Sequence, residues 1–311
     1  MEVLRTERLR LRWFTLDDAP QLLALLNEPG WISNISDPGV RDLAQARDWM
    51  QSRLLDHYWK LGHGFWALER LADGEFLGLC GVFKRDALEH PDVGYALLER
   101  HQGQGYAREA AAASLRYAHE VLGLDCVQAI IAPHNQASAR VLLAIGMQEQ
   151  GQRQVAGYDG GSLLFEWRAA SGAADDDAAQ IDALAARFLG AFANRDGRCP
   201  TLAALPYWML PDAQIRCQDG QQGAQLMDVQ GFVLPRAELL REGGRLQDFA
   251  EWELVHETRI HGRIAQRWLR YEKAGRLDGA PYAGRGQKSL QLLKTARGWR
   301  IAAVLWQDEA A

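Results

Sequence analysis

The stretch from Ala169 to Ala179 is built from small, polar and acidic residues and offers nothing large and apolar to bury. Such a composition is typical of a linker, or of a linker that runs into the acidic first turn of a helix. The chain has 311 residues, a length that favours two domains over one. We therefore predict a first domain over residues 1–170, a linker over 171–179 and a second domain over 180–311.

Composition and charge exclude several classes of protein. Hydrophobic residues make up 48% and charged residues 24%, which is a globular balance. The net charge of −5 is not that of a nucleic-acid-binding body, and no uncharged apolar run approaches the length of a membrane helix. The first residues lack the pattern of a signal peptide. The four cysteines, Cys80, Cys126, Cys199 and Cys217, are scattered and form no C-x-x-C pair. We therefore expect a cytoplasmic protein without disulfides or a metal site.

Strand and helix patterns alternate in the first half, which predicts an α+β domain with a mixed sheet. The first expected strand covers 4–14, where Leu9, Leu11 and Trp13 alternate with arginines, and Thr15 then caps a helix in a pattern close to a capping box. The remaining expected helices cover 43–60, 106–122 and 136–145, and the strands cover 64–70, 76–83, 93–98, 126–132, 147–155 and 162–168.

The second half begins with helices and ends with strands. One apolar helical stripe runs from Ile181 to Phe192, and shorter helices fit 202–210 and 233–241. Four strand-like runs follow, at 246–257, 259–271, 284–295 and 299–306, and Ala296-Arg297-Gly298 closes the last hairpin. This order suggests a curved antiparallel sheet wrapped around helices.

The turn Arg100-His101-Gln102-Gly103-Gln104-Gly105 follows a predicted strand and precedes a predicted helix. Its glycines permit a tight turn, and the free amides at the start of a helix attract anions. A dinucleotide-binding fingerprint would need glycine at position 108, where the chain has Arg108, and the Gly-Lys-Ser/Thr of a nucleotide-binding loop is absent. By itself the turn is either an anion site or a plain connection.

Several motifs in a fixed order decide between these two. The turn is followed by a strand, then by His134-Asn135-Gln136-Ala137-Ser138, then by a helix that ends at Gly146. This arrangement resembles the GCN5-related N-acetyltransferase (GNAT) family over residues of about 3–168. The opening Thr6–Arg12 and the segment Asp92-Val93-Gly94-Tyr95 are similar to the branch that acetylates the N-termini of ribosomal proteins.

The resemblance implies acetyl-CoA as co-substrate and assigns roles to particular residues. The backbone of Leu97 and Leu98 would pair with the pantetheine arm, Asn135 would contact the same arm, and Ser138 would face the departing thiolate. Capping of the following helix is the alternative role for Asn135 and Ser138. The pyrophosphate would be held beside Arg100 by the amides of Gln102, Gly103, Gln104, Gly105, Tyr106 and Ala107.

Direct transfer to an amine requires a group that takes up the amine's proton. The resemblance points to Asp92, with Glu89 as second choice, and either can equally be a solvated loop acid. No covalent nucleophile is needed, so we expect Cys80 to be a small buried side chain. Aromatic residues that can line an acceptor pocket or belong to the core are Trp31, Tyr58, Phe65 and Trp66.

The second half resembles the nuclear-transport-factor-2-like superfamily, which includes ketosteroid isomerase and polyketide cyclases. His256 and His261 are spaced for opposite faces of a strand, so we predict no zinc site there. Asp248, Glu253 and His256 are candidate acid or base groups in a cavity, or members of cross-strand charge pairs with nearby arginines.

The sequence thus predicts an N-acetyltransferase that acts on a primary amine, at a peptide or protein N-terminus or on a small molecule. The second domain would dimerise the protein or bind a ligand, and no nucleic-acid or membrane partner is expected. One alternative is an acyl-CoA or small-ligand sensor without turnover. The other is a bifunctional protein whose second domain has isomerase-like or hydratase-like activity.

Overall fold

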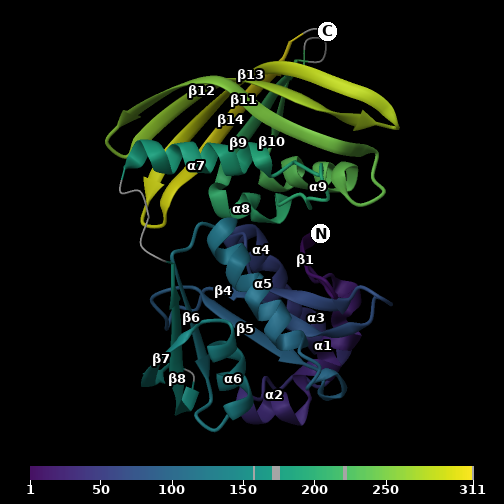
Figure 1. Ribbon diagram of the computed structural model, residues 1–311, viewed down its shortest axis with the longest axis vertical. Coiled ribbons are helices and arrows are strands. Elements are labelled where there is room, and N and C mark those ends of the chain that lie inside the picture. Colours follow the sequence, from purple (N-terminus) through teal and green to yellow (C-terminus); the bar gives the residue numbers. More distant parts are fainter. Residues whose placement is uncertain (157, 170–175, 220–222, 310–311) are drawn as a thin grey trace. The chain divides into compact units, whose positions relative to one another are not determined.

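The computed structural model describes residues 1–156, 158–169, 176–219 and 223–309, and the chain forms two compact units, Met1–Gly172 and Ala173–Ala311 (Figure 1). Of the predicted linker, residues 171–175 lie outside the described residues. Helix α7 (Asp177–Gly190) begins inside the rest of it, where the Asp176 side chain caps the helix by accepting the amide of Ala178.

The first unit is built on one mixed sheet of eight strands in the order β1-β2-β3-β4-β5-β6-β8-β7. Neighbouring strands are antiparallel except for β5 and β6, which are parallel. The α+β class and the mixed sheet predicted for this half are confirmed. The strands are β1 (Glu2–Arg5), β2 (Leu9–Arg12), β3 (Phe65–Arg70), β4 (Phe76–Phe83), β5 (Asp92–Leu97), β6 (Cys126–Ile131), β7 (Gln148–Val155) and β8 (Tyr158–Arg168).

The N-terminal segment differs from the single strand predicted over 4–14. It forms the hairpin β1–β2, because the chain turns between Arg5 and Leu9, where the Thr6 amide donates to the Leu9 carbonyl. Leu9 and Leu11 are fully buried, so the alternation that predicted a half-buried strand is confirmed for β2. The capping box at Thr15 is also confirmed, with Asp18 as its acidic partner.

The helices of the first unit are mostly those expected. The predicted helix over 43–60 is present as α3 (Leu43–Met50), a π-helical turn η2 (Gln51–Leu55) and α4 (Asp56–Leu61), and α1 covers Ala19–Leu26. The short α2 (Pro29–Asn34) was not predicted. The remaining elements are η1 (Leu16–Asp18), η3 (Glu99–His101), α5 (Tyr106–Glu120) and α6 (Gln136–Ala144).

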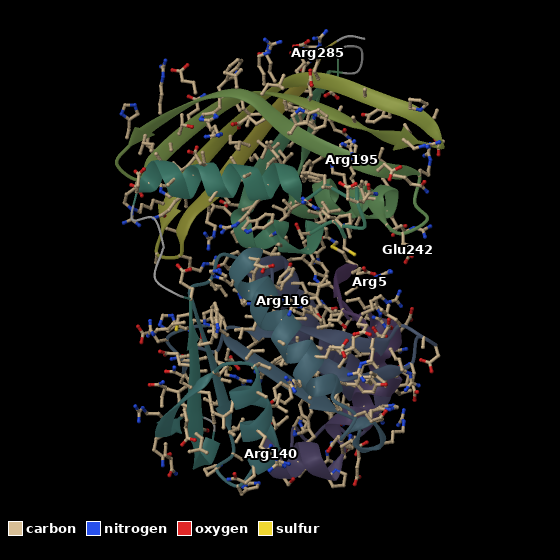
Figure 2. The ribbon with its side chains drawn as sticks, in the orientation of Figure 1. Arg5, Arg116, Arg140, Arg195, Glu242 and Arg285 are labelled. Atoms are coloured by element: carbon tan, nitrogen blue, oxygen red, sulfur yellow. The ribbon has the colours of Figure 1, made fainter. Side chains whose placement is uncertain are left out.

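Helix α5 packs across one face of the sheet (Figure 1). Its Ser114 hydroxyl lies 3.4 Å from the thiol of Cys80 on β4, and its Tyr117 ring meets Trp66 of β3 edge to face at 5.3 Å. The opposite side of the helix is solvated, as the exposed Arg116 labelled in Figure 2 illustrates. The face against α5 therefore forms one half of the core.

The second unit packs helices on one face of a six-stranded sheet of order β10-β9-β14-β13-β12-β11 (Figure 1). Strands β9 (Met209–Asp219) and β10 (Gly223–Met227) were not predicted, and β14 (Gly298–Asp308) pairs with β9 in parallel. The other strands are β11 (Leu246–His261), β12 (Ile264–Leu277) and β13 (Ala280–Thr295), and the helical elements besides α7 are η4 (Leu202–Ala204), α8 (Leu205–Trp208) and α9 (Val229–Leu240).

Strand β11 is longer than predicted. The chain turns at Gly262, whose φ is 59°, and not near Thr258, because the extended pairing with β12 continues to His261. The turn before Trp299 lies where it was expected, with Gly298 at a φ of 85°. Arg285 on β13, labelled in Figure 2, forms an ion pair of 3.0 Å with Glu309 beyond the last strand.

Helix α7 is fixed to the sheet by apolar and charged contacts. The predicted apolar stripe is confirmed, since Ile181, Leu184 and Phe188 are all buried. Asp182 accepts from the buried Arg267 of β12 at 2.7 Å, and Asp177 pairs with Lys294 of β13 at 2.6 Å. Within the described ranges, no helix is both long and apolar enough to cross a bilayer.

Candidate active site

Strands β5 and β6 of the first unit separate soon after they meet. Among the described residues their only paired position is Asp92 with Gln128, although β5 continues for five more residues, to Leu97, and β6 for three, to Ile131. Parallel neighbours normally bond along their whole shared length. The sheet is therefore open between β5 and β6, and backbone groups of β5 face that opening.

The register of β5 against β4 identifies these backbone groups. The Leu98 amide donates to the Leu77 carbonyl at 3.0 Å, so Leu98 points toward β4. Because alternate residues of a strand direct their backbone to opposite sides, Leu97 and Tyr95 direct theirs toward β6. Of the two backbone positions predicted, Leu97 faces the opening and Leu98 is engaged in the sheet. Tyr95 was missed.

The turn after β5 presents free amides. The Gln102 amide donates to the Glu99 carbonyl at 3.1 Å, and Glu109 is the first helical amide bonded back into the turn, to Gly105. In between, no described residue accepts from the amides of 103–108. Gly103 and Gly105 have φ of 72° and 83°, which other residues adopt at a cost. Five of the six predicted amide positions, Gly103 to Ala107, are thus available to an anion.

Arg8, from the turn between β1 and β2, holds this loop in place. Its guanidinium donates to the Gln104 carbonyl at 3.1 Å, pairs with Glu109 at 2.6 Å and lies 4.6 Å from the centre of the Tyr106 ring. The Thr6 hydroxyl donates to the same Glu109 carboxylate at 2.5 Å. Sequence reasoning used this segment only as a family signature and missed Arg8 as the residue that fixes the turn.

The side chains of the turn divide into inward and outward ones. The Gln102 amide nitrogen donates to the Leu97 carbonyl at 3.1 Å, which joins the turn to the end of β5. Arg100 is 60% exposed and lies 3.5 Å from the Glu75 carboxylate, and Arg108 is also exposed. Both arginines can turn toward a bound anion, since neither is buried in a fixed contact.

Asn135 and Ser138 lie at the start of α6. The Asn135 side chain caps the helix by accepting the Ser138 amide at 3.0 Å, so the capping role is present in the structure. The Tyr95 hydroxyl donates to the Ser138 carbonyl at 3.1 Å and thereby connects β5 to α6. The Ser138 side chain also interacts with the Tyr95 hydroxyl, so it lies at the same edge of the opening.

The two candidate bases have opposite surroundings. Asp92 is only 1% exposed, pairs through Oδ2 with Arg85 at 3.0 Å, and its Oδ1 is a buried oxygen without a hydrogen-bond partner among the described residues. Burial raises the pKa of the Asp92 carboxyl, and Arg85 opposes that shift. Glu89 has a side chain that is 84% exposed. Asp92 therefore lies in an environment that alters its acid–base chemistry.

Asp92 belongs to a cluster on the face of the sheet turned away from α5. Phe65 and Phe83 stack at 5.3 Å, and the Arg85 guanidinium lies about 6 Å from both ring centres. Gly94 leaves room for the Phe65 ring, because a Cβ there would lie 2.8 Å from it. Of the predicted aromatic set, Phe65 is in this cluster, whereas the buried side chains are Trp31, Tyr58 and Trp66.

The region of β4 around Cys80 is structural. The Cys80 side chain is fully buried, as expected, and burial raises the pKa of its thiol to about 12. Two glycines beside Cys80 let the neighbouring backbone approach β4 closely. A Cβ at Gly78 would meet the Ala96 carbonyl at 2.1 Å, and one at Gly81 would meet the Gly64 carbonyl at the same distance. Neighbouring strands already occupy the space.

The candidate acid–base residues of the second unit do not line its cavity. Glu253 pairs with Arg267 at 2.7 Å and contacts His256, which favours the cross-strand charge pairing considered above. Asp248 has a φ of 50°, at an irregular point of β11. A cavity of about 270 Å³ is lined instead by other charged residues, namely Arg236, Glu251, Lys273 and Lys288.

Comparisons with known proteins agree with this geometry. A family profile described as "Acetyltransferase (GNAT) domain" matches residues 8–148. The uncharacterized protein YkkB of Bacillus subtilis (strain 168) is 36% identical over 147 residues, which are 46% of this chain and 83% of that protein. The uncharacterized N-acetyltransferase p20 of Bacillus licheniformis is 30% identical over 154 residues, or 49% of this chain and 85% of that protein.

Among solved structures, an acetyltransferase from Agrobacterium tumefaciens str. C58 is 28% identical. The similarity covers 54% of this chain and 95% of the other, with a TM-score of 0.47.

Proposed function

Because the chain belongs to the GNAT acetyltransferase family through its first unit, we propose that it transfers an acetyl group from acetyl-CoA to a primary amine by direct attack. The amine is an N-terminus of a peptide or protein, or a small molecule. The proposal that acetyl-CoA is the donor rests on the opening between β5 and β6, which ends at a turn with free amides.

The donor would be held mainly by backbone groups. The pantetheine arm, an extended chain with two amides, suits the backbone of Tyr95 and Leu97 in the opening. The pyrophosphate suits the amides of Gly103 to Ala107, because they converge at the start of α5 and the helix dipole favours negative charge there. Asn135 and Ser138 lie at the start of α6, which borders the same opening through the contact between Ser138 and Tyr95.

The transfer step needs one proton acceptor and one polar group near the sulfur. The neutral amine attacks the thioester carbonyl carbon, the C–N bond forms, and the C–S bond breaks with its electron pair leaving on sulfur. Asp92 takes the amine's proton, directly or through water, since its unpartnered Oδ1 and raised pKa suit a base. The Ser138 hydroxyl donates a hydrogen bond to the leaving thiolate, which takes up a proton from water and ends as the CoA thiol, while Asp92 returns the amine's proton to water.

Binding of acetyl-CoA to the full chain tests the donor site. Gly105→Glu puts a carboxylate among the amides, and we expect it to weaken acetyl-CoA binding by about 100-fold or more in calorimetry. Gly123→Glu is the matched control, because Gly123 has a φ of 74° just after α5, at the end of that helix opposite the turn, and should cost similar backbone strain. Equal loss of binding in both variants, or none in Gly105→Glu, would reject the site.

Turnover separates the enzyme from the alternative of a sensor. Release of the CoA thiol is measured with a panel of peptides with free N-termini, polyamines and aminoglycosides. Amine-dependent release that Asp92→Asn reduces would support transfer with Asp92 as the base. Acetyl-CoA binding without release for any amine of the panel would favour the sensor.

We also propose that the second unit has the nuclear-transport-factor-2-like fold and joins two copies of the cytoplasmic protein. The support is a group of exposed apolar side chains on its sheet, among them Trp268, Leu293 and Leu305. Apolar patches of this kind mark contact surfaces. A dimer in sedimentation that Trp268→Glu converts to monomer would support the proposal, and a monomeric parent protein would reject it.

A further inference from the structure

The cavity of the second unit combines aromatic walls with charged groups from four elements. Arg236 comes from α9, Glu251 from β11, Lys273 from β12 and Lys288 from β13. Aromatic residues surround them, including Phe188, Phe232, Phe249, Tyr282 and Trp306. Charged groups in an apolar cavity cost free energy, so each should have a partner of opposite charge.

Two of the three cations have such a partner. Lys288, which is buried, pairs with the Glu251 carboxylate, and its ammonium lies 4.1 Å from the centre of the Tyr271 ring. Lys273 pairs at 2.7 Å with Asp308 of β14, and the Tyr271 hydroxyl donates to the same carboxylate at 2.5 Å. Glu251 of the lining and Asp308 outside it are therefore each compensated by a lysine.

Arg236 is the remaining cation. Its Nη1 donates to the Phe232 carbonyl at 2.9 Å, one turn earlier in α9, and its guanidinium lies 4.0 Å from the Phe232 ring and 5.5 Å from the Trp306 ring. No described carboxylate forms an ion pair with it. Burial lowers the pKa of Arg236, which reflects the cost of this uncompensated charge.

We propose that this cavity binds a small carboxylate that carries an aromatic or apolar group, with Arg236 pairing the carboxylate. The charges decide the sign of the ligand: three cations and one acid, Glu251, line the cavity, and Asp308 outside it pairs with Lys273, so an anion completes the balance and a cation does not. The aromatic walls accept the apolar part, and a guanidinium is the side chain best shaped to pair a carboxylate.

The volume limits the size of the ligand. A cavity of about 150 Å³ accommodates benzene, so the 270 Å³ found in this unit suits a single ring with a short acidic side chain, or an aliphatic acid of similar volume. The mouth is bordered by Pro235, which is exposed, and the inner wall by Val304, which is fully buried. A ligand can therefore enter between α9 and the strands that line the cavity.

Three probes of equal size and different charge test the proposal on the full chain. Phenylacetate is the anion, 2-phenylacetamide is its neutral analogue and 2-phenylethylamine is the cation, each titrated by calorimetry. We expect phenylacetate to bind at least about tenfold more tightly than the amide, and the amine to bind most weakly. No saturable binding of phenylacetate, or tighter binding of the amide or the amine, would overturn the proposal.

The Arg236→Met variant locates the effect. It removes the charge and keeps an apolar stem, so the preference for phenylacetate over the amide should fall below about threefold, with a melting temperature close to that of the parent. Arg245→Met is the control, because Arg245 pairs with Asp278 on the surface and does not line the cavity. An unchanged preference in Arg236→Met, or an equal loss in Arg245→Met, would assign the binding to another place.

The inference is separable from acetyl transfer. Arg236→Met should leave acetyl-CoA binding unchanged, and Gly105→Glu should leave the phenylacetate preference unchanged. Loss of phenylacetate binding in Gly105→Glu would place that probe in the donor site and overturn the cavity assignment, without bearing on the acetyltransferase.

Discussion

The opening between β5 and β6 and the cavity of the second unit are two different ways to build a binding site. The first is made of backbone: amides of a turn, the edge of a strand and the start of a helix. The second is made of side chains that converge from two helices, α7 and α9, and several strands. Backbone groups have no protonation state and no rotamers, so the first site does not depend on a balance of charges, whereas the second does.

This difference predicts how each site responds to substitution. A change in the backbone-built site should alter binding and leave stability nearly unchanged. A change at a paired charge of the cavity, Lys288 or Glu251, should alter stability strongly, because it leaves the opposite charge without a partner.

The largest effect is expected at the buried pair of Lys288 and Glu251. Lys288→Met leaves the Glu251 carboxylate unpaired in the cavity, which should lower the free energy of unfolding by about 3–5 kcal/mol. The double variant with Glu251→Met should recover most of this loss. Urea unfolding followed by circular dichroism measures both, and an equal loss in the single and double variants would contradict the account.

The next prediction concerns Arg8, which holds the turn of the backbone-built site in place. Arg8→Met removes the contacts with Gln104, Glu109 and the Tyr106 ring, so acetyl-CoA affinity should fall about tenfold, or ~1.4 kcal/mol. Arg10→Met is the control. Arg10 lies on the same hairpin as Arg8, but it pairs with Glu69 of β3 and does not touch the turn. If both variants lose the same affinity, the hairpin as a whole is responsible and Arg8 has no special role.

The third prediction concerns pH. Since burial raises the folded-state pKa of Asp92 above its ordinary value of 3.8, the group favours the folded state at low pH, and this contribution is lost as pH rises. The parent protein should therefore lose stability relative to Asp92→Asn as pH increases above about 4, by at most ~1.4 kcal/mol per pH unit. Melting temperatures of both proteins from pH 4 to 8 measure it, and the opposite trend would show that Arg85 outweighs burial.

The smallest effect is expected for the hydrogen bond across the opening. Tyr95→Phe removes the hydrogen bond to the Ser138 carbonyl, and one such bond contributes about 0.5–1.5 kcal/mol. The affinity for acetyl-CoA should therefore fall about threefold. Tyr117→Phe is the control, since the buried Tyr117 hydroxyl has no partner among the described residues and its removal should be neutral. Equal acetyl-CoA affinities for the parent and Tyr95→Phe would mean that this hydrogen bond does not contribute to the donor site.

The sequence predicts the backbone-built site well because its information is local. A strand, two glycines and a helix follow one another between Asp92 and Glu120, and each imposes its geometry on the next. What it did not reveal is Arg8, about one hundred residues away, and Tyr95, whose role depends on where β6 leaves β5. Long-range contacts of this kind leave no periodic signal.

The cavity was harder to predict for the same reason. Its charged residues come from elements spread over the second unit, and the strands β9 and β10 were not predicted at all. One signal was present. Lys288 shares the alternation of Leu290 and Leu292, which are buried, so a lysine on the apolar face of a strand was visible in the sequence.

The support that Arg8 gives to the turn has a consequence for the order of events during synthesis. We expect the segment around Gly103 to Gly105 to acquire its fixed form only when the β1–β2 hairpin packs beside α5, because Arg8 contacts residues about one hundred positions away. Acquisition of acetyl-CoA binding during refolding would then report the arrival of the N-terminal hairpin. A tag or truncation that disturbs the first eight residues should therefore alter the conformation of the turn at Gly103 to Gly105, although the sequence of that turn is unchanged.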